Sequence, residues 1–210
     1  MKPFRWAMTV WTVFLLSAAT GAATEPTGPL ESLRGPIERI IKVLNDPLYE
    51  GTGSKKKQRD DIWAIARPIY DFEEISKRAI GKPWLDFTAS EKSRFTTVFS
   101  EFLGTTYIDK LQGEYNKETI DFEKELVKGS VALVRTKLRR GGAEIPIDYR
   151  MKKIDGTWKV YDIIVENGVS LIKNYRVQFT SILQKESPGQ LIQRLESKLA
   201  QQNGQTGIAN

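Results

Sequence analysis

The fold is decided by residues 144–166, which read EIPIDYRMKKIDGTWKVYDIIVE. Apolar and polar residues alternate here: Tyr149 and Met151 are flanked by charged residues, and an Asp-Gly doublet at 155–156 interrupts the pattern. A period of two is typical of strands with one buried face, and Asp-Gly is typical of a two-residue hairpin turn. The stretch therefore predicts two antiparallel strands, one on each side of the doublet.

The same alternation extends toward the N-terminus. The predicted strands cover residues 119–127, 130–139, 144–154 and 157–166. Gly129 and the Gly141–Gly142 doublet fall where the remaining turns are needed. Helical periodicity on both sides of this meander indicates an α+β domain, in which helices cover one face of a four-stranded antiparallel sheet. One face of that sheet is then apolar and the other charged.

Apolar residues recur every three or four positions in the rest of the chain, which is the period of an amphipathic helix. The predicted helices cover residues 36–44, 55–66, 71–80, 88–111 and 170–183, and a last one begins at 187. Residues 24–35 are expected to form an irregular lead-in, with Pro36 in the first turn of the first helix. Asp71, Thr88 and Ser187 are predicted to be N-caps.

Composition limits the chemistry that this chain can perform. It has 210 residues, a formal net charge of +6, 40% hydrophobic residues, and neither His nor Cys. These absences exclude Ser-His-Asp and Cys-His nucleophilic sites, thiol redox chemistry, disulfides and ordinary structural zinc sites. An enzyme would have to use carboxylate, Lys, Tyr or Ser–Lys chemistry. The length and apolar content suffice for one packed domain.

Residues 1–23 have the three parts of a secretory signal peptide. A short basic start precedes an uncharged, mostly apolar run at 6–16, and small residues follow. We expect cleavage after Ala23 and export; an uncleaved membrane anchor is the alternative. Residues 24–202 are then a single domain, and residues 203–210 are expected to be a disordered tail.

Cleavage also changes the charge balance. The loss of Lys2 and Arg5 lowers the net charge from +6 to +4. A mildly basic exported protein is a weak candidate for nucleic-acid binding, so no nucleic-acid partner is predicted.

Two charged clusters have both ordinary and functional interpretations. Residues 55–59 (KKKQR) are basic and precede two aspartates. They fit a solvated helix face, or a contact with anionic lipid headgroups or an acidic partner protein. Asp121, Glu123 and Glu125 project from one side of the first strand, as on an edge strand protected against pairing. A calcium site is the alternative.

The helix predicted at 88–111 carries an aromatic stripe that includes Phe95, Phe99, Phe102 and Tyr107. Such a stripe is by default part of the core. Together with the aromatic residues of the sheet and of the helix at 170–183, it provides more large apolar surface than one sheet requires. Core packing and an apolar-ligand pocket between sheet and helices both remain open on this pattern.

The second half of the chain resembles the MlaC family of periplasmic lipid-binding auxiliary proteins, also called toluene-tolerance auxiliary proteins. The motifs WKVYD, VE, GVSL and NYR follow one another between 158 and 176. In the N-terminal half, the family pattern is matched by Tyr70, Phe72, Gly81 and Trp84. The resemblance covers residues 37–199. One departure is Asn167, since many members run directly from Glu to Gly at this point.

The resemblance implies a periplasmic shuttle that carries phospholipid between the outer and inner membranes, with no enzymatic activity. It implies a curved, nuclear-transport-factor-like sheet with an apolar pocket between the sheet and the helices. The implied partners are an inner-membrane ABC transporter complex with its MCE-domain subunit and an outer-membrane lipoprotein complex, and no cofactor or metal is implied. Hopanoid-associated relatives are also similar, so a hopanoid or another apolar molecule is the alternative cargo.

The residues expected to line the pocket are selected by the side of the strand or helix on which they lie, together with the resemblance. They are Trp84, Phe95, Phe99, Phe102, Leu103, Tyr107, Ile147, Tyr149, Met151, Val160, Val169 and Leu171. A charged residue in place of Phe99 or Tyr149 is expected to abolish lipid retention without unfolding the protein.

Two other functions remain open. A small isomerase-type enzyme on the same sheet would use Tyr149 and Asp162 for proton transfer, and it requires a buried Asp162. A structural adaptor would bind another envelope protein through the basic helix, and it requires a filled core without ligand.

Overall fold

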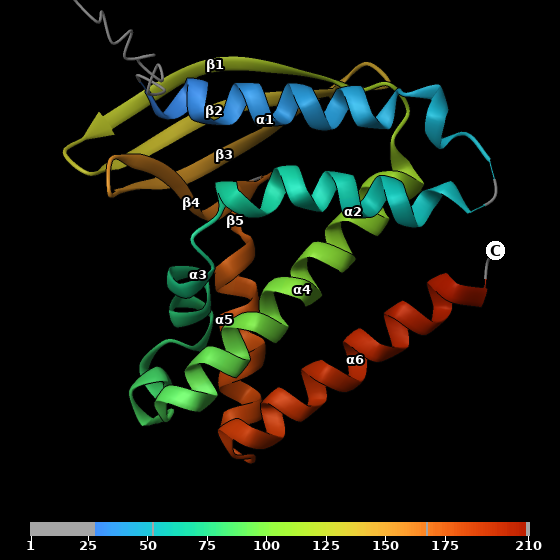
Figure 1. The fold of residues 1–210 in the computed structure, drawn as a ribbon. Coiled ribbons are helices and arrows are strands. Elements are labelled where there is room, and N and C mark those ends of the chain that lie inside the picture. The colour runs from blue at the N-terminus through green and yellow to red at the C-terminus, as the bar shows by residue number, and fades with distance from the viewer. Residues whose placement is uncertain (1–27, 52, 167, 209–210) are drawn as a thin grey trace, which may run out of the picture.

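The computed structural model describes residues 28–51, 53–166 and 168–208 (Figure 1). The predicted signal peptide lies outside these residues. The helices are α1 (Pro29–Leu44), α2 (Ser54–Ala66), α3 (Phe72–Ile80), α4 (Ala89–Glu114), α5 (Leu171–Leu183) and α6 (Pro188–Ile208). The strands are β1 (Thr119–Lys128), β2 (Val131–Arg140), β3 (Ala143–Ile154), β4 (Thr157–Val165) and β5 (Val169–Ser170).

The sheet has the order β1-β2-β3-β4-β5, with every neighbouring pair antiparallel. The α+β class and the four predicted strands are confirmed. The turns use residues with positive φ, as two-residue hairpins with the twist of the sheet require: Gly141 and Gly142 between β2 and β3, and Asp155 and Gly156 between β3 and β4.

The prediction of four strands was one short. The fifth strand, β5, has two residues, which pair with Ile164 and Val165 at the end of β4. A strand this short contains no alternation that the sequence could reveal.

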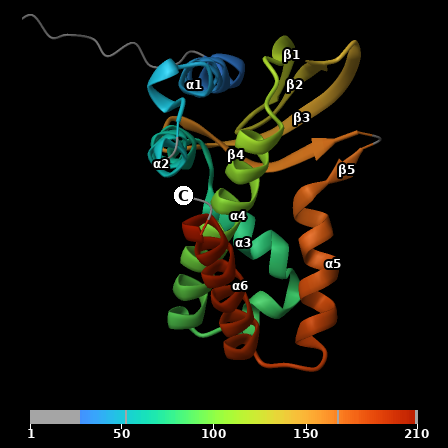
Figure 2. The same cartoon turned by 90° about the vertical axis from the view of Figure 1, so that its right-hand side faces the viewer.

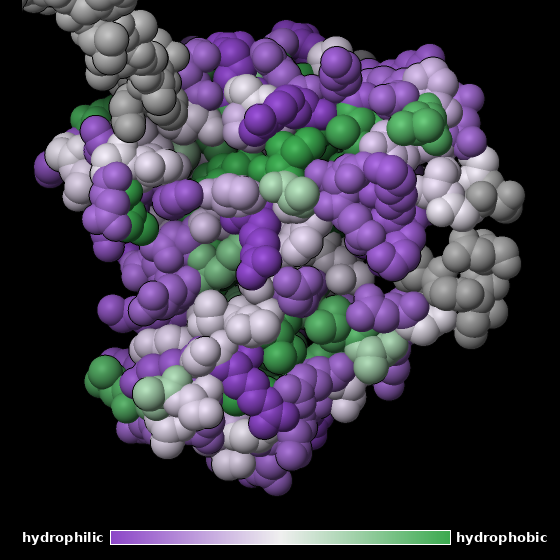
Figure 3. All heavy atoms as spheres, viewed as in Figure 1, coloured by the Kyte–Doolittle hydropathy of each residue, from purple (hydrophilic) through white to green (hydrophobic). Residues whose placement is uncertain are grey.

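The hydrophobic core is divided into two clusters. One lies between α1 and the sheet and contains Leu33, Val134, Tyr149, Met151 and Val160. The other lies among α3, α4, α5 and α6, which extend away from the sheet as a helical lobe (Figure 2). On the face shown in Figure 3, hydrophobic side chains gather between α1 and α2 and, separately, between α4 and α6.

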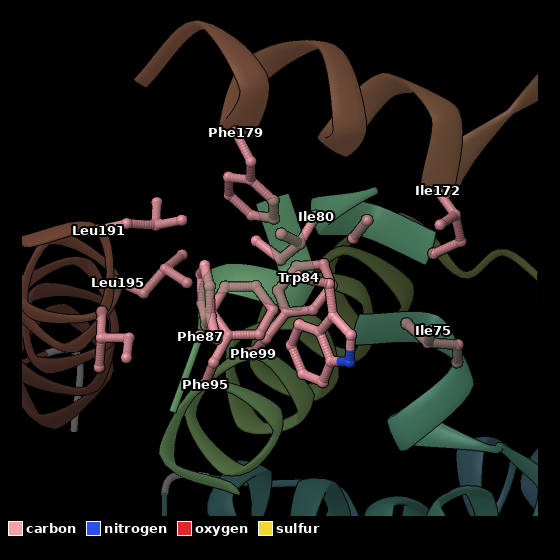
Figure 4. Packing of buried hydrophobic residues seen from close by; sticks show 12 residues of the cluster. Ile75, Ile80, Trp84, Phe87, Phe95, Phe99, Ile172, Phe179, Leu191 and Leu195 are labelled. Carbon is pink, nitrogen blue, oxygen red and sulfur yellow. The ribbon is translucent and has the colours of Figure 1, made fainter. Parts of the chain in front are cut away.

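The aromatic stripe of α4 packs inside the helical lobe. The ring centroids of Phe95 and Phe99 are 5.3 Å apart, and that of Phe179 on α5 lies 5.6 and 5.2 Å from them (Figure 4). Leu191 and Leu195 of α6 close the cluster. The stripe thus fills a helix–helix core and leaves the apolar face of the sheet to α1.

The predicted N-caps are confirmed. The side chain of Asp71 accepts a hydrogen bond from the backbone N–H of Glu74 at 3.0 Å. Thr88 and Glu91 exchange reciprocal side-chain-to-backbone bonds of 2.9 and 3.2 Å, which form a capping box at the start of α4. Ser187 caps α6 in the same way.

Two helix ends differ from the prediction. The first helix begins at Pro29 rather than Pro36, because Pro29 occupies the first turn after Gly28 and the buried Leu33 anchors that turn to the sheet. The last helix continues to Ile208, whereas a disordered tail was expected from residue 203. Once the packed first half of α6 has formed, each further helical residue adds a backbone hydrogen bond at little cost.

In the described part of the chain, no helix combines the length and apolar character that a bilayer crossing needs.

We expect Phe95→Ala to lower the free energy of unfolding by about 3–5 kcal/mol, because it opens a cavity among four other rings of the helical lobe. Urea unfolding followed by circular dichroism measures the loss. Leu85→Ala is the matched control, since the Leu85 side chain is exposed. Equal stability of the two variants would contradict the assignment of Phe95 to the core.

Candidate functional site

An apolar cavity of about 190 Å³ lies where the two core clusters approach each other. Segments from α2, α3, α4, β4 and α5 surround it. Its lining consists of Trp63, Ala66, Tyr70, Phe72, Ile75, Leu103, Gly104, Tyr107, Ile108, Val160, Asp162, Ile163, Leu171 and Ile172. The cavity is therefore bounded on one side by the sheet and on the other by the helical lobe.

A glycine shapes the wall formed by α2 and α4. A Cβ atom on Gly104 would lie 2.8 Å from Cζ3 of Trp63, closer than packed atoms allow. The absence of a side chain therefore lets the indole lie directly against α4. On its other side, the Trp63 ring packs against Phe72, with 5.6 Å between the centroids.

Asp162 is the charged residue among the described residues that line the cavity, and it is 5% exposed. The hydroxyl of Ser170 donates to its two carboxylate oxygens at 2.8 and 3.0 Å, and the backbone N–H of Ile172 donates at 3.3 Å. Arg150 pairs with it at 3.4 Å. The carboxylate is thus satisfied at the N-terminus of α5, where the helix dipole favours an anion.

Burial keeps the phenols of Tyr70, in the cavity wall, and Tyr149, in the sheet core, neutral. Burial raises the pKa of the Tyr70 phenol to about 12. Burial, together with the neighbouring Tyr70, also raises the pKa of the Tyr149 phenol. Neither group exchanges a proton near neutral pH, so both present an uncharged ring to their surroundings.

The twelve residues selected from the sequence divide among four places. Leu103, Tyr107, Val160 and Leu171 line the cavity.

The other eight are not brought to the cavity. Trp84, Phe95 and Phe99 are buried in the helical lobe, with Phe102 packed against them. Ile147, Tyr149 and Met151 belong to the cluster between α1 and the sheet. Val169 is exposed on β5.

This placement changes what a charge at Phe99 or Tyr149 would do. Phe99 is completely buried and Tyr149 nearly so. An unpaired charge in such a position has a large desolvation cost, so it would destabilise the fold instead of only removing a ligand.

Several lining residues were not selected from the sequence. They are Trp63, Ala66, Tyr70, Phe72, Ile75, Gly104, Ile108, Ile163 and Ile172, together with Asp162, which was considered only as a catalytic base. One signal was available: an isolated glycine inside a strong helical pattern marks a close approach of another group. The remaining residues lie on elements whose relative placement the sequence does not reveal.

The two charged clusters form ion pairs. On the first strand, Asp121 pairs with Arg139 and Glu123 with Lys137, while Glu125 accepts a hydrogen bond from the backbone N–H of Leu30. Within the ranges that the structure describes, no group of carboxylates is arranged to hold a metal ion.

The basic cluster on α2 is also paired. Lys56 contacts Asp60 and Lys57 contacts Asp61, each at 2.6 Å. Exposed pairs one helical turn apart contribute little energy, so Lys56 and Lys57 lie on a solvated face. Arg59 differs, because its side chain is largely buried and pairs with Asp109.

An antiparallel sheet and a helical lobe that enclose an apolar cavity define a protein built to bind an apolar ligand. Comparison with known proteins agrees. The family model described as MlaC protein matches residues 35–197. The chain belongs to this family.

Two curated relatives and one solved structure are similar to this chain. The intermembrane phospholipid transport system binding protein MlaC of Haemophilus influenzae is 25% identical over 202 residues, which cover 91% of this chain and 90% of the relative. The toluene tolerance protein ttg2D of Pseudomonas putida is 31% identical over 160 residues, 75% and 74% of the two chains.

The solved structure is that of a phospholipid-binding protein from Ralstonia solanacearum in complex with a phospholipid. It has a TM-score of 0.72 and 24% identity to this chain, and the match covers 83% of this chain and 98% of that one. This likeness confirms the fold.

We expect Asp162→Ala to lower the free energy of unfolding by about 1–3 kcal/mol, because it leaves the Ser170 hydroxyl and the Ile172 N–H without their shared acceptor. Thermal unfolding measures the effect. The control is Asp121→Ala, which removes a half-exposed partner of Arg139 and is expected to cost less than about 1 kcal/mol. An equal loss of stability in both variants would show that the buried hydrogen bonds of Asp162 contribute no more than an exposed ion pair.

Proposed function

We propose that this protein is a periplasmic phospholipid carrier that moves lipid between the outer and inner membranes. The observation that carries the proposal is the apolar cavity between the sheet and the helical lobe, found in a chain of the MlaC family. The name of the Haemophilus relative, which assigns it to intermembrane phospholipid transport, and the phospholipid in the Ralstonia structure support it.

The physical need for a carrier follows from the hydrophobic effect. Each methylene left in water costs about 0.8 kcal/mol, and a two-tailed phospholipid carries about 30 of them. A carrier has to shield the tails and can leave the headgroup wet. An apolar cavity whose carboxylate is already satisfied by Ser170 and the start of α5 meets that requirement.

The size of the cavity indicates that loading widens it. About 190 Å³ is little more than the about 150 Å³ of a cavity that holds benzene, and ligand pockets usually reach about 300–1,000 Å³. The cavity lies between two separately packed clusters, so it can grow by parting them while each keeps its own packing.

Binding without catalysis is favoured by the state of the two residues that an isomerase would need. Asp162 is buried, as that hypothesis requires, but it is occupied by Ser170, Ile172 and Arg150. Tyr149 lies in the sheet core with its pKa raised by burial. Asp162 is thus engaged by the protein's own groups, and Tyr149 does not line the cavity.

Export, cargo and partners complete the proposal. Residues 1–23 have the pattern of a signal peptide, which agrees with a periplasmic location. A carrier of this kind exchanges phospholipid with an inner-membrane ABC transporter complex, through its MCE-domain subunit, and with an outer-membrane lipoprotein complex. It needs no cofactor or metal.

Native mass spectrometry of the protein purified without detergent tests the proposal. We expect a stoichiometric adduct with the mass of a phospholipid, identified after solvent extraction. An adduct of hopanoid mass would identify a hopanoid, instead of a phospholipid, as the cargo. A protein that takes up no lipid, even from vesicles, would contradict the carrier function.

Leu171→Trp tests the cavity itself. The larger side chain fills the space that a lipid tail needs, so we expect bound lipid to fall by about ten-fold while the fold is kept. Val177→Trp on the same helix is the matched control, because Val177 is 65% exposed. If Leu171→Trp retains as much lipid as the control, the lipid does not occupy this cavity.

A further inference from the structure

A second cleft lies next to the apolar cavity, behind Trp63. It has a volume of about 590 Å³ and is formed by α2, α4 and α6, which lie on the face shown in Figure 3. Trp63, Gly104 and Ile108 line both spaces. The indole of Trp63 lies against α4 because Gly104 has no side chain, and it therefore separates the apolar cavity from the cleft.

The cleft is lined by charges of both signs. Lys56, Arg59 and Asp60 come from α2, and Glu101 comes from α4. Lys56 and Asp60 form an exposed pair with each other. Glu101 has no ion-pair or hydrogen-bond partner in the part of the chain that the structure describes, so its carboxylate is available to a cationic group.

Arg59 is placed to receive an anion. Its side chain is 13% exposed, and its Nη2 lies 2.7 Å from Oδ1 of Asp109. The buried Arg59 Nε and Asp109 Oδ1 nevertheless have no hydrogen bond. Burial raises the pKa of the Asp109 carboxyl in spite of the nearby guanidinium. The guanidinium has five N–H donors, and the pair with Asp109 engages Nη2, so donors remain for strong, charge-assisted hydrogen bonds to phosphate oxygens.

We propose that this cleft binds the headgroup of a zwitterionic phospholipid whose tail occupies the apolar cavity. Arg59 contacts the phosphodiester and Glu101 contacts the ammonium group. The inference rests on the proposed carrier function and adds the class of headgroup. It follows from two features: opposite charges on α2 and α4 face one cleft, and that cleft shares a wall with the space for the tail. The proposal requires Trp63, which lines both spaces, to move when a lipid joins them.

The test offers the protein vesicles made of equal parts of phosphatidylethanolamine and phosphatidylglycerol. The bound lipid is extracted and its headgroups are quantified by mass spectrometry. We expect wild-type protein to enrich phosphatidylethanolamine by about five-fold, as one hydrogen bond between charged groups allows. Glu101→Gln is expected to abolish this enrichment, so that the bound lipid mirrors the vesicle mixture.

The phosphate contact needs a variant that leaves no buried charge unpaired. The double variant Arg59→Gln/Asp109→Asn removes both members of the pair, and we expect it to lower the binding of both lipids by about ten-fold. Glu38→Gln on α1 and Lys55→Gln on α2 are matched controls outside the cleft, and both are expected to behave as wild type. Circular dichroism verifies that every variant is folded.

The outcomes separate this inference from the proposed function. Bound lipid that mirrors the vesicle mixture, enrichment that survives Glu101→Gln, or undiminished binding by the double variant would overturn the headgroup site and leave the carrier intact. Wild-type protein that takes up neither lipid would overturn both. Tail-free glycerophosphoethanolamine is expected to bind far more weakly than the lipid; equal binding would assign the cleft to a soluble phosphate ester instead.

Discussion

The carboxylate of Asp162 joins the sheet to the helical lobe. A buried charge is costly unless it is paired and hydrogen-bonded. Here the requirement is met by the Ser170 hydroxyl and the Ile172 N–H on one side and by Arg150 of β3 on the other. Because these partners hold the first turn of α5 against β4, they also set where the rest of α5 lies. The position of the helical lobe, and with it the cavity, depends on this contact.

A second connection between the sheet and the helical lobe also involves β4. The backbone N–H of Asp71 donates to the carbonyl of Val160 at 2.9 Å, so the start of α3 is tied to the same strand. Strand β4 therefore contributes to the sheet core and also holds the starts of two lobe helices. This strand therefore connects the two clusters.

Local patterns predicted the elements of this fold well and their assembly poorly. The alternation in residues 144–166 and the Asp155–Gly156 turn depend on neighbours in sequence, and so do the caps at Asp71 and Thr88. The start of α1 was missed because it depends on Leu33 reaching the sheet, which is a tertiary contact.

The site shows the same limit more strongly. Phe95 and Phe99 have the pattern expected of a pocket wall and of a core alike, and only the packing of Phe179 against them decides for the core. Leu103 and Tyr107 continue the same helix and do reach the cavity. Which part of one stripe meets a neighbour and which part meets a cavity is set by the crossing of the helices, and periodicity contains no information about that crossing.

Gly104 is the place where the local sequence and the fold disagree in an informative way. A glycine inside a 26-residue helix costs about 1 kcal/mol relative to alanine. That cost is offset by the contact that it permits, since any side chain at this position would push Trp63 away from α4. A local sacrifice of helix stability for one close approach is typical of a functional position. Here the approach separates an apolar space from a charged one, as the binding of an amphiphile requires.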